Sequence, residues 1–218
     1  MLLVFVAFAS ISLQAQENRD GKGVWFIFLE SGKKTPDDKE AVGKMQRGHI
    51  ENFKRLFAEK KLFAAGPLRD PAGLKRGIVV VSAASREQLI GYFQPDDYVR
   101  EGYMTINASL SRVHKGLNTE GIDTENIEEV RIVQITRPAT KPDASAEKAG
   151  QAFLQGLVDK GIIGAWYTLE TGPTAEILFA RTTDSKMLEE ALALHPALVS
   201  KLASLLIWSQ WLSKGVVK

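Results

Sequence analysis

The feature that most constrains the fold of this chain is an order of secondary-structure elements that occurs twice. In each half, the hydrophobic patterns predict strand, helix, strand, strand, helix and strand in succession. This order is typical of a split β-α-β unit, the ferredoxin-like pattern. We therefore predict an α+β fold made of two tandem ferredoxin-like repeats.

The first repeat is predicted over residues 23–113. Its first helix is predicted to begin at Thr35-Pro36-Asp37-Asp38, with a capping hydroxyl, a proline in the first turn and two acids near the positive helix end. Gly43 and Gly48 are expected to break that helix into pieces. Ser85-Arg86-Glu87-Gln88 is a capping box for the second helix. The strands are expected at residues 24–29, 62–68, 77–82 and 103–113.

The second repeat is predicted over residues 129–213, after a polar stretch at 114–128 that we interpret as a linker. Sliding the halves by 100 positions matches Phe53 with Phe153, and exact identities are few. The repeat therefore depends on the order of its elements. Strands are expected at 130–135, 161–169, 176–180 and 202–212, helices at 146–160 and 185–194, and a loop at 138–145.

The N-terminus carries an apolar run from Leu2 to Leu13. The run is shorter than the roughly 20 residues that cross a bilayer as a helix. It is typical of a secretory signal with cleavage after Ala15, although no Lys or Arg precedes it. A buried first strand is the alternative. We expect residues 1–15 to be a signal peptide, the protein to be exported, and no stable membrane insertion to remain after processing.

Composition excludes several kinds of chemistry. The 218 residues include no cysteine, which removes disulfides, thiolate metal sites and a Cys nucleophile. With 28 Lys and Arg against 26 Asp and Glu, nothing predicts nucleic-acid binding. His114 and His195 lie at no metal-ligand spacing, and no phosphate or dinucleotide loop is present. We expect no cofactor and no metal.

Several motifs of the first half occur together. They are Gly48-His49 on the first helix, the run LFAAGPL at residues 62–68, Asp70, Arg76 before GIVVV, and Asp96-Asp97-Tyr98. In this combination, residues 24–113 resemble the YCII-related family. The second half keeps the layout but places other residues at the positions of His49 and Asp70.

This resemblance implies a fold and a site. Members of the family are ferredoxin-like domains whose sheets pair into a dimeric α+β barrel, so this chain would form that barrel as an intrachain pseudo-dimer, either monomeric or paired into a homodimer. The family is similar to enzymes that act on ring-cleavage products, such as muconolactone isomerase. By the resemblance, His49 and Asp70 are the catalytic pair, with Arg76 and Asp96 as substrate-binding residues.

Each of these residues also has a structural interpretation. His49 follows the apolar stripe of its helix, so it is either a buried histidine or a general acid or base. Asp70 begins an Asp-Pro-x-Gly turn, where its carboxylate would accept local N–H groups, or it orients the imidazole of His49. Arg76 would either bind a carboxylate or lie in solvent. Asp96 would cap a short helical turn or reach the pocket.

Two functions stay open from the sequence. The first is a His/Asp-dependent lyase, isomerase or hydrolase-like enzyme that acts on a small organic acid or lactone. The second is a non-catalytic small-molecule-binding or assembly module. Contact between the His49 ring and the Asp70 carboxylate beside an open cavity would favour the enzyme.

Overall fold

A computed structural model describes residues 21–137, 140 and 143–218, so the predicted signal segment and part of the predicted loop at 138–145 lie outside the described residues. The first half contains β1 (Gly23–Ser31), α1 (Lys39–Ala58), β2 (Leu62–Pro67), β3 (Lys75–Ala83), α2 (Arg86–Gly91), α3 (Asp97–Arg100) and β4 (Met104–Lys115). The second contains β5 (Asp123–Thr136), α4 (Ala144–Asp159), β6 (Ala165–Leu169), β7 (Thr174–Ala180), α5 (Ser185–Leu192), α6 (Pro196–Val199) and β8 (Leu205–Lys214).

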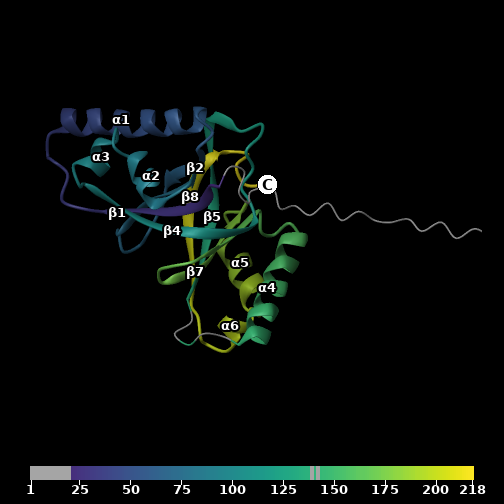
Figure 1. Cartoon of the computed structure of the whole chain (residues 1–218). Coiled ribbons are helices and arrows are strands. Elements are labelled where there is room, and N and C mark those ends of the chain that lie inside the picture. The colour runs from purple at the N-terminus through teal and green to yellow at the C-terminus, as the bar shows by residue number, and fades with distance from the viewer. Residues whose placement is uncertain (1–20, 138–139, 141–142) are drawn as a thin grey trace, which may run out of the picture.

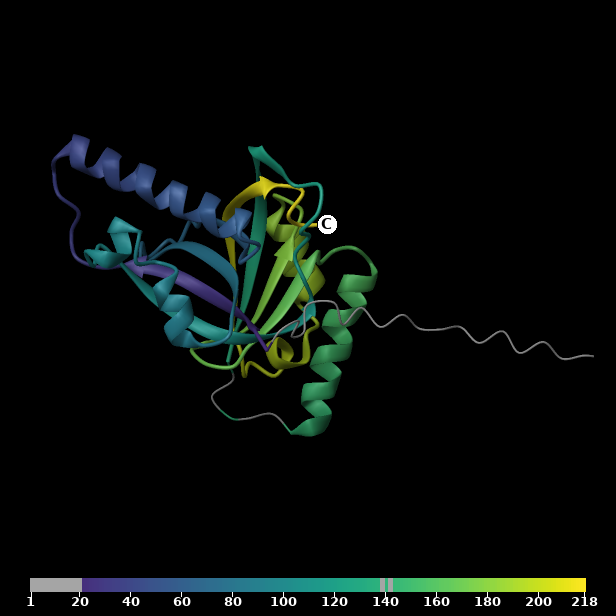
Figure 2. The same ribbon diagram turned by 45° about the horizontal axis from the view of Figure 1, so that its top comes forward.

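The strands form one antiparallel sheet in the order β2-β3-β1-β4-β6-β7-β5-β8. Each half contributes four strands in the same relative order, and the pairing of β4 with β6 joins the halves. The two outer strands approach each other, since Leu68 forms an isolated bridge with Gln210 and the Arg69 N–H donates to the Ser209 carbonyl at 3.0 Å. The sheet is therefore nearly closed, with the helices outside it (Figures 1 and 2).

Both faces of the sheet are buried. On β1, Phe26 and Phe28 belong to the cluster inside the curved sheet, whereas Ile27 and Leu29 belong to the cluster beneath α1 and α2. This alternation follows from the two-residue period of a strand. It explains why the sequence of β1 is a continuous apolar run, which is typical of a strand buried on both faces. A third cluster fills the space beneath α4 and α5.

Helix α1 differs from the prediction at its start and in its continuity. It begins at Lys39, because Asp38 is the N-cap and its Oδ1 accepts the N–H groups of Glu40 and Ala41 at 2.9 and 3.2 Å. The expected break at Gly43 and Gly48 is wrong, since the helix is continuous for 20 residues. Each glycine costs about 1 kcal/mol, which the burial of the apolar face against the sheet outweighs.

The predicted linker at 114–128 is also largely wrong. Strand β4 continues through Lys115 and β5 begins at Asp123, which leaves only residues 116–122 between them. The side chains at the start of β5 are mostly exposed, so the strand has no buried apolar pattern there. Backbone pairing with β8, from Ile127 onward, forms the strand without such a pattern.

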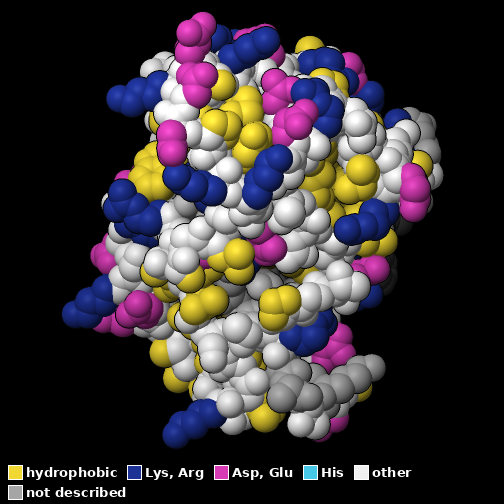
Figure 3. Space-filling model, turned by 90° about the vertical axis from the view of Figure 1, so that its left-hand side faces the viewer, with side chains coloured by type: hydrophobic (Ala, Val, Ile, Leu, Met, Phe, Trp, Pro, Cys, Tyr) yellow, Lys and Arg dark blue, Asp and Glu magenta, His cyan; other side chains and the backbone are white. Residues whose placement is uncertain are grey.

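The surface shows no dominant charge on the side in Figure 3, where both charge signs and separate hydrophobic groups are intermixed. Within the part of the chain that the structure describes, no helix is long and apolar enough to span a bilayer.

Candidate functional site

His49 forms a buried polar pair with Asp96. Its Nδ1 lies 2.6 Å from Asp96 Oδ2, and the Asp96 side chain is fully buried. The other oxygen of Asp96, Oδ1, accepts the Tyr98 N–H at 3.0 Å and caps α3. Asp96 therefore fixes the imidazole and the start of α3 at once, which confirms the capping interpretation of this residue.

Aromatic rings surround the imidazole of His49. The ring of Phe53 lies edge-on at 4.4 Å between centroids, and that of Tyr98 lies perpendicular at 5.7 Å. The side chain of His49 is 11% exposed, and no described residue bonds to its Nε2. The pair is a mostly buried contact between α1 and α3.

Asp70 lies on the β2–β3 hairpin and bonds within its own turn. Its carboxylate accepts the N–H groups of Ala72, Leu74 and Lys75 at 2.9, 3.1 and 2.8 Å. Burial disfavours the ionised carboxylate, but these N–H groups outweigh it and lower the pKa of Asp70. The structure therefore does not form the expected His49–Asp70 pair, because local backbone donors hold the Asp70 carboxylate.

Arg76 lies on the same hairpin, at the start of β3. Arg76 is exposed, and its side chain makes no hydrogen bond with the described residues. Of the four residues predicted for the site, the structure brings together His49 and Asp96, and leaves Asp70 and Arg76 on the hairpin.

The second half has an imidazole in a comparable contact, supplied from the opposite side. His195 caps α6, accepting the Ala197 N–H at 3.3 Å, and its ring lies perpendicular to that of Phe153 at 5.6 Å. A Cβ on Gly150 of α4 would lie 3.3 Å from His195 Nε2. In the first half, helix α1 supplies the imidazole of His49. In the second half, the N-cap of α6 supplies the imidazole of His195.

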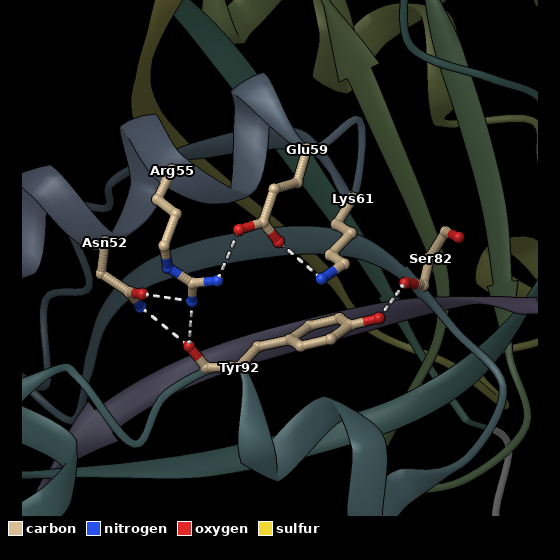
Figure 4. A network of polar contacts seen from close by, with 6 residues as sticks. All are labelled: Asn52, Arg55, Glu59, Lys61, Ser82 and Tyr92. Carbon is tan, nitrogen blue, oxygen red and sulfur yellow. Dashed lines mark hydrogen bonds and ion pairs between the residues drawn. The ribbon is translucent and has the colours of Figure 1, made fainter.

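A polar network closes the C-terminal end of α1 (Figure 4). Asn52 Nδ2 and Arg55 Nη2 both donate to the Tyr92 carbonyl at 3.1 Å. Glu59 accepts from Arg55 at 3.0 Å and from Lys61, and these two partners lower the pKa of Glu59. The network attaches α1 to the end of α2.

Beside this helix lies a cavity of about 210 Å³ that sequence reasoning missed. Its wall combines α1, β2, the start of β5 with Ile122 before it, and β8 with Val216 after it. The cavity therefore joins the two halves where the outer strands approach. No local motif marks it, because four distant segments build it. The lining residues are Ile50, Phe53, Lys54, Phe57, Leu62, Phe63, Ala64, Ala65, Ile122, Thr124, Leu212, Ser213 and Val216.

The described residues contain no group of three or more side chains arranged to hold a metal ion. Phe53 contacts both the His49 ring and the cavity, but His49 itself is not part of the wall.

No protein-family model matches the chain, and no curated protein matches it. The resemblance to the YCII-related family therefore stays a prediction.

Solved structures do match, and over nearly the whole chain. A protein of Fusobacterium nucleatum described as a "putative monooxygenase" has a TM-score of 0.55 at 9% identity, covering 91% of this chain and 97% of its own. One of Lactobacillus acidophilus with the same description has a TM-score of 0.51 at 11% identity, covering 90% and 98%. A heme-binding protein of Thermus thermophilus has a TM-score of 0.51 at 11% identity, covering 88% and 91%. At such low identity these matches show the fold, the dimeric α+β barrel, and nothing of the activity.

Proposed function

We propose that this protein binds a small, mainly apolar organic molecule in the cavity between α1, β2 and β8. The observation that carries the proposal is the composition of the wall. Nearly all of it is aliphatic or aromatic, and Lys54 is the one ionisable side chain among the lining residues. Apolar cavities of comparable size hold small hydrocarbons, and a few polar groups at the rim orient a ligand.

Lys54 favours a ligand with one acidic group at its end. The ammonium pairs with Glu51 at 2.9 Å on the exposed side of α1, and hydrogen bonding with Glu51 raises the pKa of Lys54. The lysine therefore stays charged at the rim. Thr124 and Ser213 add hydroxyl groups there. A small aromatic or aliphatic carboxylate matches this arrangement.

A binding role fits this geometry better than the enzyme predicted with His49. The imidazole is paired with the buried Asp96 and is not part of the cavity wall, whereas its neighbour Phe53 is. The lining residues contain no acid and base within reach of each other. Binding is thus the function that the cavity supports.

Heme, which one structural neighbour binds, does not match this cavity. Protein ligands to heme iron are His, Cys, Met or Tyr. None of these is among the lining residues. The lining residues therefore do not fit heme.

The test is a titration observed at the side chains of the wall. Benzoate and toluene are added to protein labelled with ¹³C at Ile, Leu and Val methyl groups. We expect saturable shifts at Ile50, Ile122, Leu212 and Val216 with both probes, and tighter binding of benzoate. Lys54→Met should remove the preference for benzoate and leave toluene binding unchanged.

A cavity-filling variant supplies the control. Ala65→Phe places a ring at the wall and should abolish binding of both probes, whereas Ala152→Leu, on the exposed side of α4, should not. If the lining methyl groups do not shift at millimolar probe, or if Ala65→Phe binds as well as the original protein, the cavity is not the ligand site.

We also propose that the fold arose by duplication of one ferredoxin-like unit. Both halves share the order of their elements and strands, and in each half a phenylalanine of the long helix, Phe53 or Phe153, packs edge-on against an imidazole. These features support a duplicated ferredoxin-like unit that forms its barrel within one chain. Sedimentation would test whether the folded chain is monomeric.

Export is part of the proposal as well. Its support is the apolar run from Leu2 to Leu13 with a small residue at position 15. Mass spectrometry of the N-terminus of the protein from each cell fraction tests it. An exported form beginning at Gln16 is expected, and an intact N-terminus in the cytosol would contradict it.

A further inference from the structure

His114 lies outside the cavity, on the outer face of the sheet where the two halves join. It occupies an irregularity of β4, since the register with β6 shifts between Val113 and Lys115. Such bulges re-aim a side chain. Here the imidazole stacks on the indole of Trp166, with centroids 3.7 Å apart and planes within 11°. The ring is therefore held in one orientation.

A series of hydrogen bonds runs from this ring to Glu176. His114 Nε2 lies 2.8 Å from Thr168 Oγ1, and Thr168 Oγ1 lies 2.8 Å from Glu176 Oε2. Trp166 Nε1 donates to the same carboxylate oxygen at 2.7 Å. Because the hydroxyl has one proton, a Thr168 that donates to an ionised Glu176 must accept from His114 Nε2–H. The free lone pair of the imidazole is then at Nδ1.

Nδ1 of His114 is open to a ligand. No described residue bonds to it, and it is absent from the buried polar atoms without a partner. The side chain is half-buried, so solvent reaches this nitrogen.

Burial reverses the usual order of proton affinity between His114 and Glu176, the two ends of this hydrogen-bonded series. Burial, with a smaller contribution from Arg112, lowers the pKa of His114 from 6.5 to about 4. Burial also raises the pKa of Glu176, against the opposing effect of its hydrogen bonds from Trp166 and Thr168. The Glu176 carboxylate therefore binds a proton more tightly than the imidazole does, which favours proton transfer through the Thr168 hydroxyl toward Glu176.

Arg112 supplies a positive charge beside the imidazole. It precedes His114 by two residues on β4, and its charge contributes to the lowered pKa of His114, so the two side chains lie near each other. Arg112 is exposed, and Thr168 lies opposite it on β6. A guanidinium in this position can bind a carboxylate or stabilise an enolate.

We propose that His114, Thr168, Glu176 and Arg112 form a second, proton-abstracting site that takes a small 2-oxo acid with an enolisable C–H bond. Arg112 binds the carboxylate of the substrate, and His114 Nδ1 accepts the proton from the carbon next to the carbonyl. Thr168 and Glu176 are positioning and relay residues.

The step balances without a further reactant. The C–H bond breaks and its electron pair forms the enolate, while Nδ1 gains the proton. The Nε2 proton passes to Thr168 Oγ1, and the hydroxyl proton passes to Glu176 Oε2. The relay ends with a neutral imidazole protonated at Nδ1 and a neutral carboxylic acid. The Nδ1 proton then exchanges with solvent, so that reversal returns a solvent-derived proton to the enolate.

Exchange of phenylpyruvate protons tests the site on the full chain. The methylene signal is followed by ¹H NMR in D₂O, and we expect the protein to accelerate its loss above the buffer rate. His114→Gln should reduce the acceleration about 100-fold or more. Arg112→Met should raise KM, because it removes the carboxylate contact. Thr168→Val should lower kcat, and Thr168→Ser should restore it.

His195→Gln is the matched control, because that histidine caps α6, and its exchange rate should equal that of the original protein. Thermal unfolding shows which variants do not fold. If His114→Gln does not fold, the comparison of Thr168→Ser with Thr168→Val tests the proposal instead. ¹⁵N NMR should find the proton of the His114 ring on Nε2. An exchange rate equal to that of buffer, full activity in His114→Gln, or a proton on Nδ1 of the free protein would overturn the proposal.

Discussion

The imidazole of His49 and the carboxylate of Asp96 join α1 to α3 through a contact of 2.6 Å between Nδ1 and Oδ2. The carboxylate is fully buried and also caps α3 through its other oxygen. Breaking one side of a buried pair leaves the other group without its partner. Asp96 should therefore stabilise the protein in two separable ways, through its contact with His49 and through its cap on α3.

We expect Asp96→Ala to destabilise the protein by about 3–5 kcal/mol, since it removes both the pair and the cap. Asp96→Asn should cost less, because its amide oxygen can still accept the Tyr98 N–H. Urea unfolding measures both. A double-mutant cycle with His49→Ala should show coupling, and strictly additive effects would contradict a direct interaction.

The second half offers a test of the comparable contact. Gly150→Ala should fail to stabilise α4, because the new Cβ would lie 3.3 Å from His195 Nε2. Gly156→Ala is the control on the same helix, where nothing lies within 4 Å, and it should stabilise by about 0.5–1 kcal/mol. Thermal unfolding compares the two. Equal stabilisation by both would show that His195 moves away freely.

The junction of β2 and β8 depends on a glycine. A Cβ on Gly66 would lie 1.9 Å from the Trp211 carbonyl oxygen, so Gly66→Ala must separate the strands. We expect a loss of about 1–3 kcal/mol in the free energy of unfolding. Hydrogen exchange should show reduced protection of the Arg69 N–H, which donates across the junction. Unchanged protection there would mean that the junction absorbs the methyl group.

Acidification should destabilise the protein through His114. Its pKa is about 4 when folded against 6.5 ordinarily, so between these values the unfolded chain binds more protons. Stability should therefore fall as the pH is lowered from about 6.5 to 4. His195, whose pKa burial also lowers, acts in the same direction, whereas the raised pKa of Glu176 opposes it.

Replacing His114 isolates its contribution to the pH dependence of stability. His114→Gln should flatten the fall in stability over this range, measured by urea unfolding at several pH values. His195→Gln reports the second contribution in the same way. If His114→Gln leaves the pH dependence unchanged, His114 is not held in its neutral form by the fold.

The sequence predicted the elements of the fold better than their limits. The strand at residues 24–29 and the N-cap at Ser85 are confirmed, because both depend on local patterns. The reciprocal bond of a capping box differs, since the Gln88 side chain accepts the Ala84 N–H and not the Ser85 N–H. The start of α1 and the linker at 114–128 were wrong, because Asp38 competes with Thr35 for the cap and polar residues pair in exposed strands.

The site was predicted only in part. His49 and Asp96 were both singled out, but the sequence paired His49 with Asp70, which lies in a turn whose own N–H groups hold it. The side-chain partner of an imidazole depends on which distant segments pack together, and a turn motif reports only its neighbours.

The sequence by itself determined the order of strands and helices, the alternation of Phe26 and Ile27 between the two faces of β1, and the absence of thiol chemistry. The tertiary structure alone decided the near closure of the sheet at β2 and β8 and the cavity there. It alone also decided the hydrogen bonds that connect His114 to Glu176 through Thr168. Local patterns follow from backbone geometry and burial over a few residues. These sites join residues far apart in the chain, such as His114 and Thr168, 54 positions apart, and Pro67 and Gln210, 143 positions apart, whose approach only the packed sheet establishes.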